Sequence, residues 1–461
     1  MLATPVSPAM PLSGSGADMD VAYPPSPRSL LPLGTRAATA SNLVASFGQP
    51  QDPEERWWWA RCGPLFYTIL KASGSYTAEQ TADHMRVVRD VVVPSLGPRP
   101  SRAATKALIT LDGSPMEPSW NFTRGRSVVR YAFEPLWDTG SRADEPFGGR
   151  QVPELVRQLA GVAAPDTDLG WFDQIWARWS VAGDEAARAK QGLVAHGKPA
   201  SARVPQLFLA FDHHGAERRL KSYHFPMLKH LATGASTEQL MLDMIADLRP
   251  GGDELQAAAA KMKTFLDRTK YPAAVEMLSI DCVDPRAARV KIYARTRTNS
   301  LDTVRETMTL AGLQTDEHTM EGVARVERFW HLLLDERRGM DAEQSKELRV
   351  KATHHTGICF VFEIRRGSDH VSVKPQMPWC QTNGTDARGT ENFAAVLRMF
   401  GWEDHADRFE KGVKAVAALP GQNYATESGG LSYLAYEYNQ KGGDYISTYF
   451  SPRCDADHGL D

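Results

Sequence analysis

The chain has 461 residues, of which 42% are hydrophobic and 24% are charged, a composition typical of a soluble globular protein. Its formal net charge of −3 argues against nucleic acid as the main partner, because proteins that bind a phosphate backbone usually carry a basic excess. No run of about 18 apolar residues is present, which excludes a transmembrane helix.

The first 51 residues are rich in proline, serine, glycine and alanine, and they lack the basic start and apolar core of a signal peptide. We expect residues 1–51 to form a disordered tail and residues 52–461 to form a single domain. The five cysteines are scattered and include no CxxC pair. That spacing indicates reduced thiols, a cytoplasmic location and no zinc site.

After the tail, helices alternate with pairs of strands. The acidic stretch Asp52-Pro53-Glu54-Glu55 predicts a helix start, because proline lacks the N–H that a first turn leaves unpaired. Two helices are expected between Arg56 and Leu96, where Gly97-Pro98 ends the pattern. Strands are predicted at residues 106–112, 117–123, 127–134, 203–212, 218–225, 276–282, 287–296, 356–364, 370–376, 431–438 and 445–450. Helices are predicted at residues 152–160, 168–180, 237–248, 254–269, 301–310, 319–335, 391–400 and 405–418.

This order repeats as helix, strand, strand, helix, with five strand pairs. Alternating single strands and helices would imply a parallel sheet, whereas strands paired across short turns imply antiparallel hairpins. Helices between the pairs can cover one face of a common sheet. The sequence therefore predicts an α+β fold, in which a ten-stranded antiparallel barrel with a polar lumen is surrounded by helices.

The stretch from Ala287 to Arg295 carries the clearest chemical pattern. Arg289, Lys291 and Tyr293 alternate with apolar residues, so all three lie on one face of a strand. A strand face exposed to water would read the same way, and this stretch alone leaves both readings open.

The same types of residue recur on other predicted strands. Lys221 and Tyr223 repeat the Lys-x-Tyr spacing, Tyr445 and Tyr449 share one strand face, and Arg130 lies on a strand of its own. If these faces all line one lumen, it holds cations beside phenols.

Such a lumen suits the ionisation of an allylic diphosphate. Arginine and lysine hold a diphosphate through charge-assisted hydrogen bonds. A phenol ring faces a carbocation with its negative π surface, which stabilises the cation by roughly 0.5–2 kcal/mol per ring when water is excluded.

Seven segments, in this order, resemble the fungal indole prenyltransferases of the dimethylallyltryptophan synthase family, over about Trp57 to Phe450. They are Trp57-Trp58, Pro115 to Ser119, Val129 to Pro135, Leu220 to Tyr223, Ser279 to Asp281 with Arg289 to Tyr293, Phe400 to Trp402, and the terminal tyrosine hairpin. As a set they are highly specific. The resemblance implies the αββα prenyltransferase barrel.

The resemblance also implies roles for individual residues. The diphosphate is expected to bind Arg130, Lys221, Arg289, Lys291, Gln376 and Tyr445. The allyl cation is expected to lie among Tyr223, Tyr293, Tyr433 and Tyr449. The aromatic acceptor is expected to contact Leu108, Ile109, Glu117 and Phe225. Catalytic roles fall to Glu117, Lys221 and Gln206. Glu117 matches the glutamate that accepts the indole N–H, where a carboxylate stabilises positive charge that builds on the ring.

Two positions depart from the family pattern. In the segment from Lys374 to Trp379, the pattern Gln-x-Tyr matches Gln376 but has Pro378 in place of the tyrosine. A second register would put Lys374 in the anion site and Gln376 at the tyrosine position. Gln206 stands near the place where some members have a lysine that takes the final proton, and an amide is a poor base.

The family members that use free tryptophan hold its carboxylate partly through a tyrosine and an arginine. This chain has Phe225 and Glu276 at those places. We therefore expect an acceptor without a free carboxylate, such as a cyclic dipeptide or an elaborated indole.

The predicted function is transfer of a dimethylallyl group from dimethylallyl diphosphate to an indole in secondary metabolism. The alternatives are a phenolic acceptor such as tyrosine, or a barrel that binds a small aromatic molecule without catalysis. The absence of an Asp-Asp-x-x-Asp motif predicts a reaction that needs no metal, with Mg²⁺ or Ca²⁺ at most enhancing it. The expected partners are these small molecules, with a homodimer left open.

Overall fold

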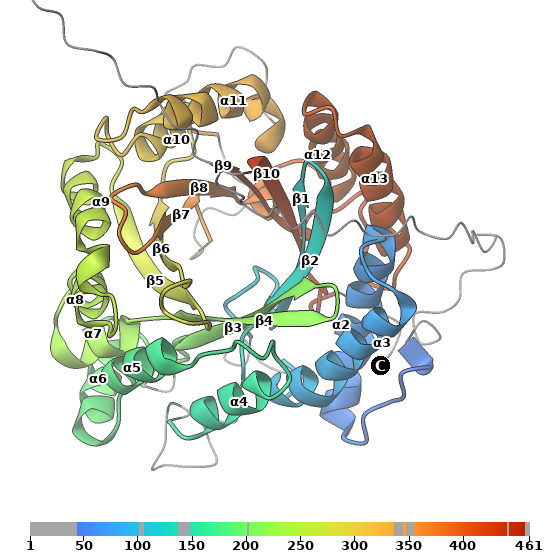
Figure 1. Ribbon diagram of the computed structural model, residues 1–461. Coiled ribbons are helices and arrows are strands. Elements are labelled where there is room, and N and C mark those ends of the chain that lie inside the picture. The colour runs from blue at the N-terminus through green and yellow to red at the C-terminus, as the bar shows by residue number, and fades with distance from the viewer. Residues whose placement is uncertain are drawn as a thin grey trace, which may run out of the picture. The chain divides into compact units, whose positions relative to one another are not determined.

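The computed structural model describes residues 44–100, 106–136, 147, 149–200, 202–335, 344–346, 355–439 and 442–456. Within them, ten antiparallel strands close into a barrel, and helices surround its wall (Figure 1). These residues belong to one compact unit. The prediction of an α+β barrel of ten antiparallel strands is confirmed.

The strands are β1 Met116–Thr123, β2 Arg126–Phe133, β3 Leu207–His214, β4 Glu217–His224, β5 Ala273–Asp281, β6 Val290–Thr296, β7 Cys359–Ile364, β8 Ser372–Met377, β9 Leu431–Asn439 and β10 Gly443–Phe450. The α-helices are α2 Pro53–Ser73, α3 Ala78–Val87, α4 Gln151–Ala160, α5 Gly170–Trp179, α6 Gly183–Ala195, α7 Met227–Thr233, α8 Thr237–Asp247, α9 Gln256–Arg268, α10 Leu301–Met308, α11 Glu317–Leu333, α12 Asp386–Met399 and α13 Glu403–Ala417. A π-helix at Val88–Val92 and a 3₁₀ turn at Val93–Ser95 extend α3.

Each strand pairs with its neighbours in the chain, and β1 closes the barrel by pairing with β10. At this seam Ser119 lies opposite Tyr449, and Phe122 lies opposite Ile446. Closure leaves no strand edge free to pair with another chain. It also brings residues from both ends of the sequence to one lumen.

Strand β6 shows how alternation separates core from lumen. Val290, Ile292 and Ala294 are fully buried and join the main hydrophobic core between strands and helices. Lys291 and Tyr293 line the cavity inside the barrel. The polar face of this strand therefore points into the lumen, and the water-facing reading is wrong.

One predicted strand is absent. Residues 106–112 form a bent loop, in which the N–H groups of Leu108 and Ile109 donate to the buried carboxylate of Glu134. Gly113 continues the bend with a φ of +92°. The Glu134 side chain, directly after β2, thus satisfies backbone groups that a strand would have paired, and the strand prediction is wrong here.

Helices α6 and α7 were not predicted from the sequence. Helix α6 buries only small residues and one leucine, namely Ala186, Ala189 and Leu193, so it lacks the broad apolar stripe of a typical amphipathic helix. Ala186 and Ala189 form a small core of their own with Val181 and with Leu228 and Ala232 of α7.

Most of the predicted tail, residues 1–43, lies outside the described residues. Its last part does pack: Val44 is buried in the core, and the ring of Phe47 lies 5.6 Å from that of Tyr67. The packed chain therefore includes part of the segment that we expected to be disordered.

All five cysteines are free and buried, as the sequence indicated. None of the helices in the described part of the chain is long and apolar enough to cross a membrane.

Helix α13 depends on a glycine for its close approach to α2 and β1. A β-carbon on Gly412 would lie 2.7 Å from the β-carbon of Ala72 and 2.8 Å from the Trp120 ring. Gly412→Ala should therefore lower the unfolding midpoint: overpacking costs about 1–3 kcal/mol, which exceeds the gain of about 1 kcal/mol in helix propensity.

Ala415→Gly, at an exposed position of the same helix, measures the propensity difference alone. A rise in the unfolding midpoint of Gly412→Ala would contradict the packing argument.

Candidate active site

A cavity of about 680 Å³ occupies the barrel lumen, and residues from all ten strands line it. This volume lies within the range of small-molecule sites, roughly 300–1,000 Å³. The side chains that line it fall into two zones along the strands, charged residues and then phenols, with Glu117 also in the lining. A mostly apolar cluster outside this lining forms a third zone, which packs against the phenol Tyr223.

The charged zone alternates in sign from strand to strand around most of the wall. We call it the charge belt, and it comprises Arg130 (β2), Asp212 (β3), Lys221 (β4), Asp281 (β5), Arg289 next to β6 with Lys291 (β6), Glu363 (β7), Lys374 (β8) and Glu437 (β9). Several members lie directly opposite a partner of the other sign, such as Lys221 and Asp281, or Lys291 and Glu363. Cross-strand pairs of this kind stabilise the sheet.

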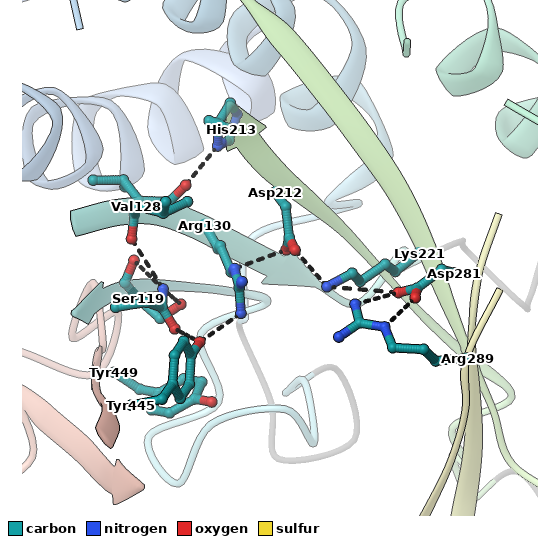
Figure 2. A network of polar contacts seen from close by, with 12 residues as sticks. Ser119, Val128, Arg130, Asp212, His213, Lys221, Asp281, Arg289, Tyr445 and Tyr449 are labelled. Carbon is teal, nitrogen blue, oxygen red and sulfur yellow. Dashed lines mark hydrogen bonds and ion pairs between the residues drawn. The ribbon is translucent and has the colours of Figure 1, made fainter. Parts of the chain in front are cut away.

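Figure 2 shows the first half of the charge belt as a chain of ion pairs. Asp212 lies 3.0 Å from Nε of Arg130 and 2.5 Å from Nζ of Lys221. Asp281 continues the chain, 3.7 Å from Lys221 and 2.5 Å from Nε of Arg289. Each carboxylate thus holds two cations at once.

The second half of the charge belt centres on Glu363. Its carboxylate lies 3.2 Å from Arg289 and 3.5 Å from Lys291. Lys374 follows on β8, with Nζ 4.6 Å from the centre of the Tyr445 ring.

Burial sets the protonation of these groups. Burial lowers the pKa of Lys221 to about 7, although Asp212 acts in the opposite direction. Burial likewise lowers the pKa of Lys374 to about 7, against Glu437. Burial by itself would raise the pKa of Asp212, but Arg130 and Lys221 hold it well below its usual value. Asp212 therefore keeps its charge, while Lys221 and Lys374 titrate near neutral pH.

Tyr445 joins the charge belt through its hydroxyl group. Arg130 Nη1 donates to this oxygen at 2.7 Å, and the hydroxyl donates to Asn121 Oδ1 at 2.7 Å (Figure 2). The predicted diphosphate residues Arg130, Lys221, Arg289, Lys291 and Tyr445 thus all line the cavity, within the charge belt or bonded to it.

The phenols lie next to the cations. The rings of Tyr223 and Tyr293 are 5.8 Å apart, and Gln376 Nε2 donates to the Tyr449 hydroxyl at 3.2 Å. Burial raises the pKa of Tyr223 and Tyr293 above the ordinary value, so these phenols stay neutral. A neutral ring presents the π face that a carbocation requires.

The sequence left open two ways of matching the β8 segment to the family pattern, and the contacts of Lys374 and Gln376 distinguish them. Lys374 lies among the cations, whereas Gln376 lies beside Tyr449 in the phenol zone. Pro378 follows the end of β8. These contacts agree with the second match, in which Lys374 lies in the anion site and Gln376 takes the tyrosine position. The phenol zone thus contains the Gln376 amide, and the charge belt gains Lys374.

Glu117 lies on β1, two residues from Ser119, and its side chain is buried. The Ser432 hydroxyl donates to its Oε1 at 2.7 Å. Burial raises the pKa of Glu117 to about 8, since this one hydrogen bond only partly offsets desolvation. Glu117 is therefore a carboxyl group whose charge is costly until a ligand compensates it.

The end of the barrel beyond the phenols is largely apolar. Ile109 and Phe208 form a buried cluster there, against which Phe225, Met277 and Tyr223 pack. Leu108 and Ile109 also anchor this end through their bonds to Glu134. Two of the predicted acceptor residues thus meet here, Ile109 within this cluster and Phe225 packed against it, and Phe225 gives an apolar surface.

Glu276 and Arg295 form an ion pair at the same end of the strands. Strand β5 has a bulge between Val275 and Met277, and Glu276 reaches Arg295 with contacts of 2.8 and 3.2 Å. A bulge changes the direction of a side chain relative to a regular strand. Arg295 Nη1 also approaches the Tyr433 hydroxyl at 3.5 Å.

Tyr433 differs from the other predicted phenols. Its hydroxyl hydrogen-bonds with Nδ1 of His355 at 2.6 Å, and its ring centre lies 6.4 Å from that of Tyr449. Tyr433 therefore lies between Tyr449 and the Arg295–Glu276 ion pair.

Gln206 is the predicted catalytic residue that stands apart. It precedes β3 and donates to the backbone oxygen of Phe147, and it does not line the lumen cavity. The sequence position near a family lysine was therefore a poor guide.

Sequence reasoning missed the carboxylates of the charge belt. Asp212 shares a strand face with Ala210 and His214, both of which line the cavity. Strand parity could have identified it, because the side chain of Asp212 points the same way as those of Ala210 and His214.

Comparison with known proteins agrees with this arrangement. The family model described as tryptophan dimethylallyltransferase matches residues 54–412. The indole diterpene prenyltransferase terF of Tolypocladium album is 33% identical over 86% of this chain and 93% of its own length. The indole diterpene prenyltransferase ltmF of Epichloe festucae var. lolii is 30% identical over 86% and 92%.

The crystal structure of AnaPT from Neosartorya fischeri has the same fold, with a TM-score of 0.75 and 24% identity over 91% of this chain and 98% of that one. The family match extends over most of the chain, and the two fungal relatives align along nearly their whole length. The chain therefore belongs to the tryptophan dimethylallyltransferase family.

Proposed function

We propose that this protein transfers a dimethylallyl group from dimethylallyl diphosphate to a neutral indole acceptor, without a required metal ion. The observation that carries the proposal is that cations, neutral phenols and the buried Glu117 line one cavity. A mostly apolar cluster packs against one of these phenols, Tyr223.

The charge belt receives the diphosphate. Its guanidinium and ammonium groups form charge-assisted hydrogen bonds with the diphosphate oxygens. The bond between C1 of the allyl group and the diphosphate oxygen then breaks, and its electron pair leaves with the diphosphate. Preorganised cations stabilise the negative charge that develops there.

The allyl cation forms against Tyr223, Tyr293 and Tyr449. A ring atom of the indole attacks it with an electron pair and forms the new bond. The proton displaced from that ring atom passes to the released diphosphate, whose oxygens become more basic as the C–O bond breaks. Gln206 takes no part, since its side-chain amide is hydrogen-bonded to the backbone oxygen of Phe147 and an amide is a poor base.

Glu117 orients the acceptor. Its carboxylate accepts the indole N–H and opposes the positive charge that spreads onto nitrogen during attack. Burial raises the pKa of Glu117 to about 8, because desolvation destabilises the ionised carboxylate. A hydrogen bond from the indole N–H therefore stabilises the ionised form of Glu117 strongly.

The acceptor is an indole without a free carboxylate, and we assign it to the indole diterpenes. Phe225 presents an apolar surface, and the Arg295 guanidinium is already paired with Glu276. The names of terF and ltmF support the same class. The free, buried cysteines favour a cytoplasmic reaction.

The direct assay measures pyrophosphate release from dimethylallyl diphosphate with an indole diterpene, in the presence of EDTA. Turnover should persist because Arg and Lys supply the positive charge, while Mg²⁺ or Ca²⁺ gives at most a modest increase. Loss of all turnover with EDTA would contradict the metal-independent site. An absence of turnover with every indole and phenol would favour a binding barrel instead.

Glu117→Gln keeps an oxygen that can accept the indole N–H but removes the charge. We expect kcat to fall about 10²–10³-fold, the range typical of a lost electrostatic contact in a transition state. In the unaltered protein, kcat/KM for the acceptor should rise with pH through the Glu117 pKa of about 8, because the carboxylate must be ionised.

That rise should be absent from the variant. Full activity of Glu117→Gln, at an unchanged unfolding midpoint, would show that the carboxylate has no such role.

Glu276→Gln should leave Arg295 free to bind an anionic acceptor. The ratio of kcat/KM for L-tryptophan to that for a neutral indole should then increase about tenfold, because charge-assisted hydrogen bonds contribute about 1.5–3 kcal/mol. The double variant Glu276→Gln/Arg295→Gln is the control and should lose the gain. Good turnover of L-tryptophan by the unaltered protein, beside poor turnover of neutral indoles, would refute the acceptor assignment.

A further inference from the structure

Asp212 occupies a central place in the charge belt. It lies on β3, and its two carboxylate oxygens contact cations on the two neighbouring strands, Arg130 on β2 and Lys221 on β4 (Figure 2). Its exposed fraction is 4%, equal to that of Lys221. A buried carboxylate in this position fixes the spacing of two cations that would otherwise repel each other.

Lys221 depends on this contact for its charge. Asp281 on β5 is its other carboxylate, at the longer distance of 3.7 Å. The cations nearest to it, Arg130 on β2 and Lys291 on β6, both oppose its protonation, as does its burial. Asp212 at 2.5 Å is therefore the strongest attraction that holds a proton on Lys221.

We propose that Asp212 is a positioning residue of the diphosphate site, which holds Arg130 and Lys221 side by side and preserves the charge of Lys221. This inference rests on the proposed function in so far as the diphosphate binds at the charge belt. Asp212 itself carries the same sign as the diphosphate, so its effect on binding passes through the two cations.

The consequence is a pH dependence with a definite direction. Burial lowers the pKa of Lys221 to about 7, so Lys221 loses its charge as the pH rises through that value. Without the Asp212 charge, this pKa falls further, and the loss begins at lower pH. A single opposite charge at this distance commonly shifts a pKa by about 1–3 units.

The first experiment measures kcat/KM for dimethylallyl diphosphate across the neutral range in Asp212→Asn. We expect the alkaline decline to begin at least about one pH unit lower than in the unaltered protein, with the deficit about tenfold above neutrality and smallest in acid. A merely structural role would lower activity by the same factor at every pH.

Two further variants sharpen this measurement. In a Lys221→Arg background the same substitution should no longer shift the decline, because arginine keeps its proton throughout. Asp83→Asn is the matched control: Asp83 on α3 also pairs with a cation of β4, Arg218, but it does not line the cavity. It should leave the pH profile unchanged. A uniform loss in Asp212→Asn, or a shift that persists with Lys221→Arg, would overturn the inference.

A second readout does not depend on catalysis. Inorganic pyrophosphate is titrated calorimetrically into each protein in two buffers of different ionisation enthalpy, which gives the number of protons taken up. Just below neutral pH, between the Lys221 pKa of the variant and that of the unaltered protein, Asp212→Asn should take up more protons per pyrophosphate, because more of its Lys221 starts neutral.

Equal uptake by the two proteins would overturn the inference even if the enzyme is active. If no indole is prenylated but this difference in uptake is found, the inference stands and the proposed function fails. A lowered unfolding midpoint of Asp212→Asn does not affect the comparison at temperatures where circular dichroism shows it folded.

Discussion

Charge compensation inside a closed barrel is the constraint on which this structure depends. A buried charge costs several kcal/mol unless an opposite charge lies near it. Here the compensation runs around the wall, because cations on one strand face carboxylates on the next, from Arg130 on β2 to Glu437 on β9. The same arrangement that stabilises the empty lumen also presents an ordered set of cations to an anionic ligand.

The regular spacing of residues along the strands places the cations, the phenols and the acceptor end at successive levels of the barrel. Residues on one face of a strand follow each other by two positions, about 6.6 Å. On and next to β6, Arg289, Lys291, Tyr293 and Arg295 therefore step from cation to phenol to the acceptor end. Similar steps occur on β4, from Lys221 through Tyr223 to Phe225. Neighbouring strands repeat the order of cation and phenol around the wall, and the loop at residues 106–112 contributes Ile109 to the apolar end.

Much of this could be predicted because alternation is a local property. The faces of β4 and β6 follow from the spacing of Lys221, Tyr223, Lys291 and Tyr293, and five hairpins with intervening helices imply a barrel. The resemblance to a known family added Glu117, which spacing alone does not distinguish from a surface acid.

The remaining features depend on contacts that the sequence does not display. The loop at residues 106–112 follows from the buried carboxylate of Glu134, directly after β2. The places of Lys374 among the cations and of Gln376 among the phenols are seen in their contacts with Tyr445 and Tyr449. Glu276 reaches Arg295 across a bulge that breaks the strict alternation of β5.

The central claim is that one lumen binds the diphosphate at the charge belt and the indole at Glu117, with the allyl group between phenols. A crystal structure with a non-ionisable thiolodiphosphate analogue of dimethylallyl diphosphate and a neutral indole tests it most directly. The account predicts diphosphate oxygens in contact with Arg130, Lys221 and Lys374, and the indole N–H directed at Glu117. A diphosphate bound away from these cations, or an indole whose N–H points elsewhere, would contradict it.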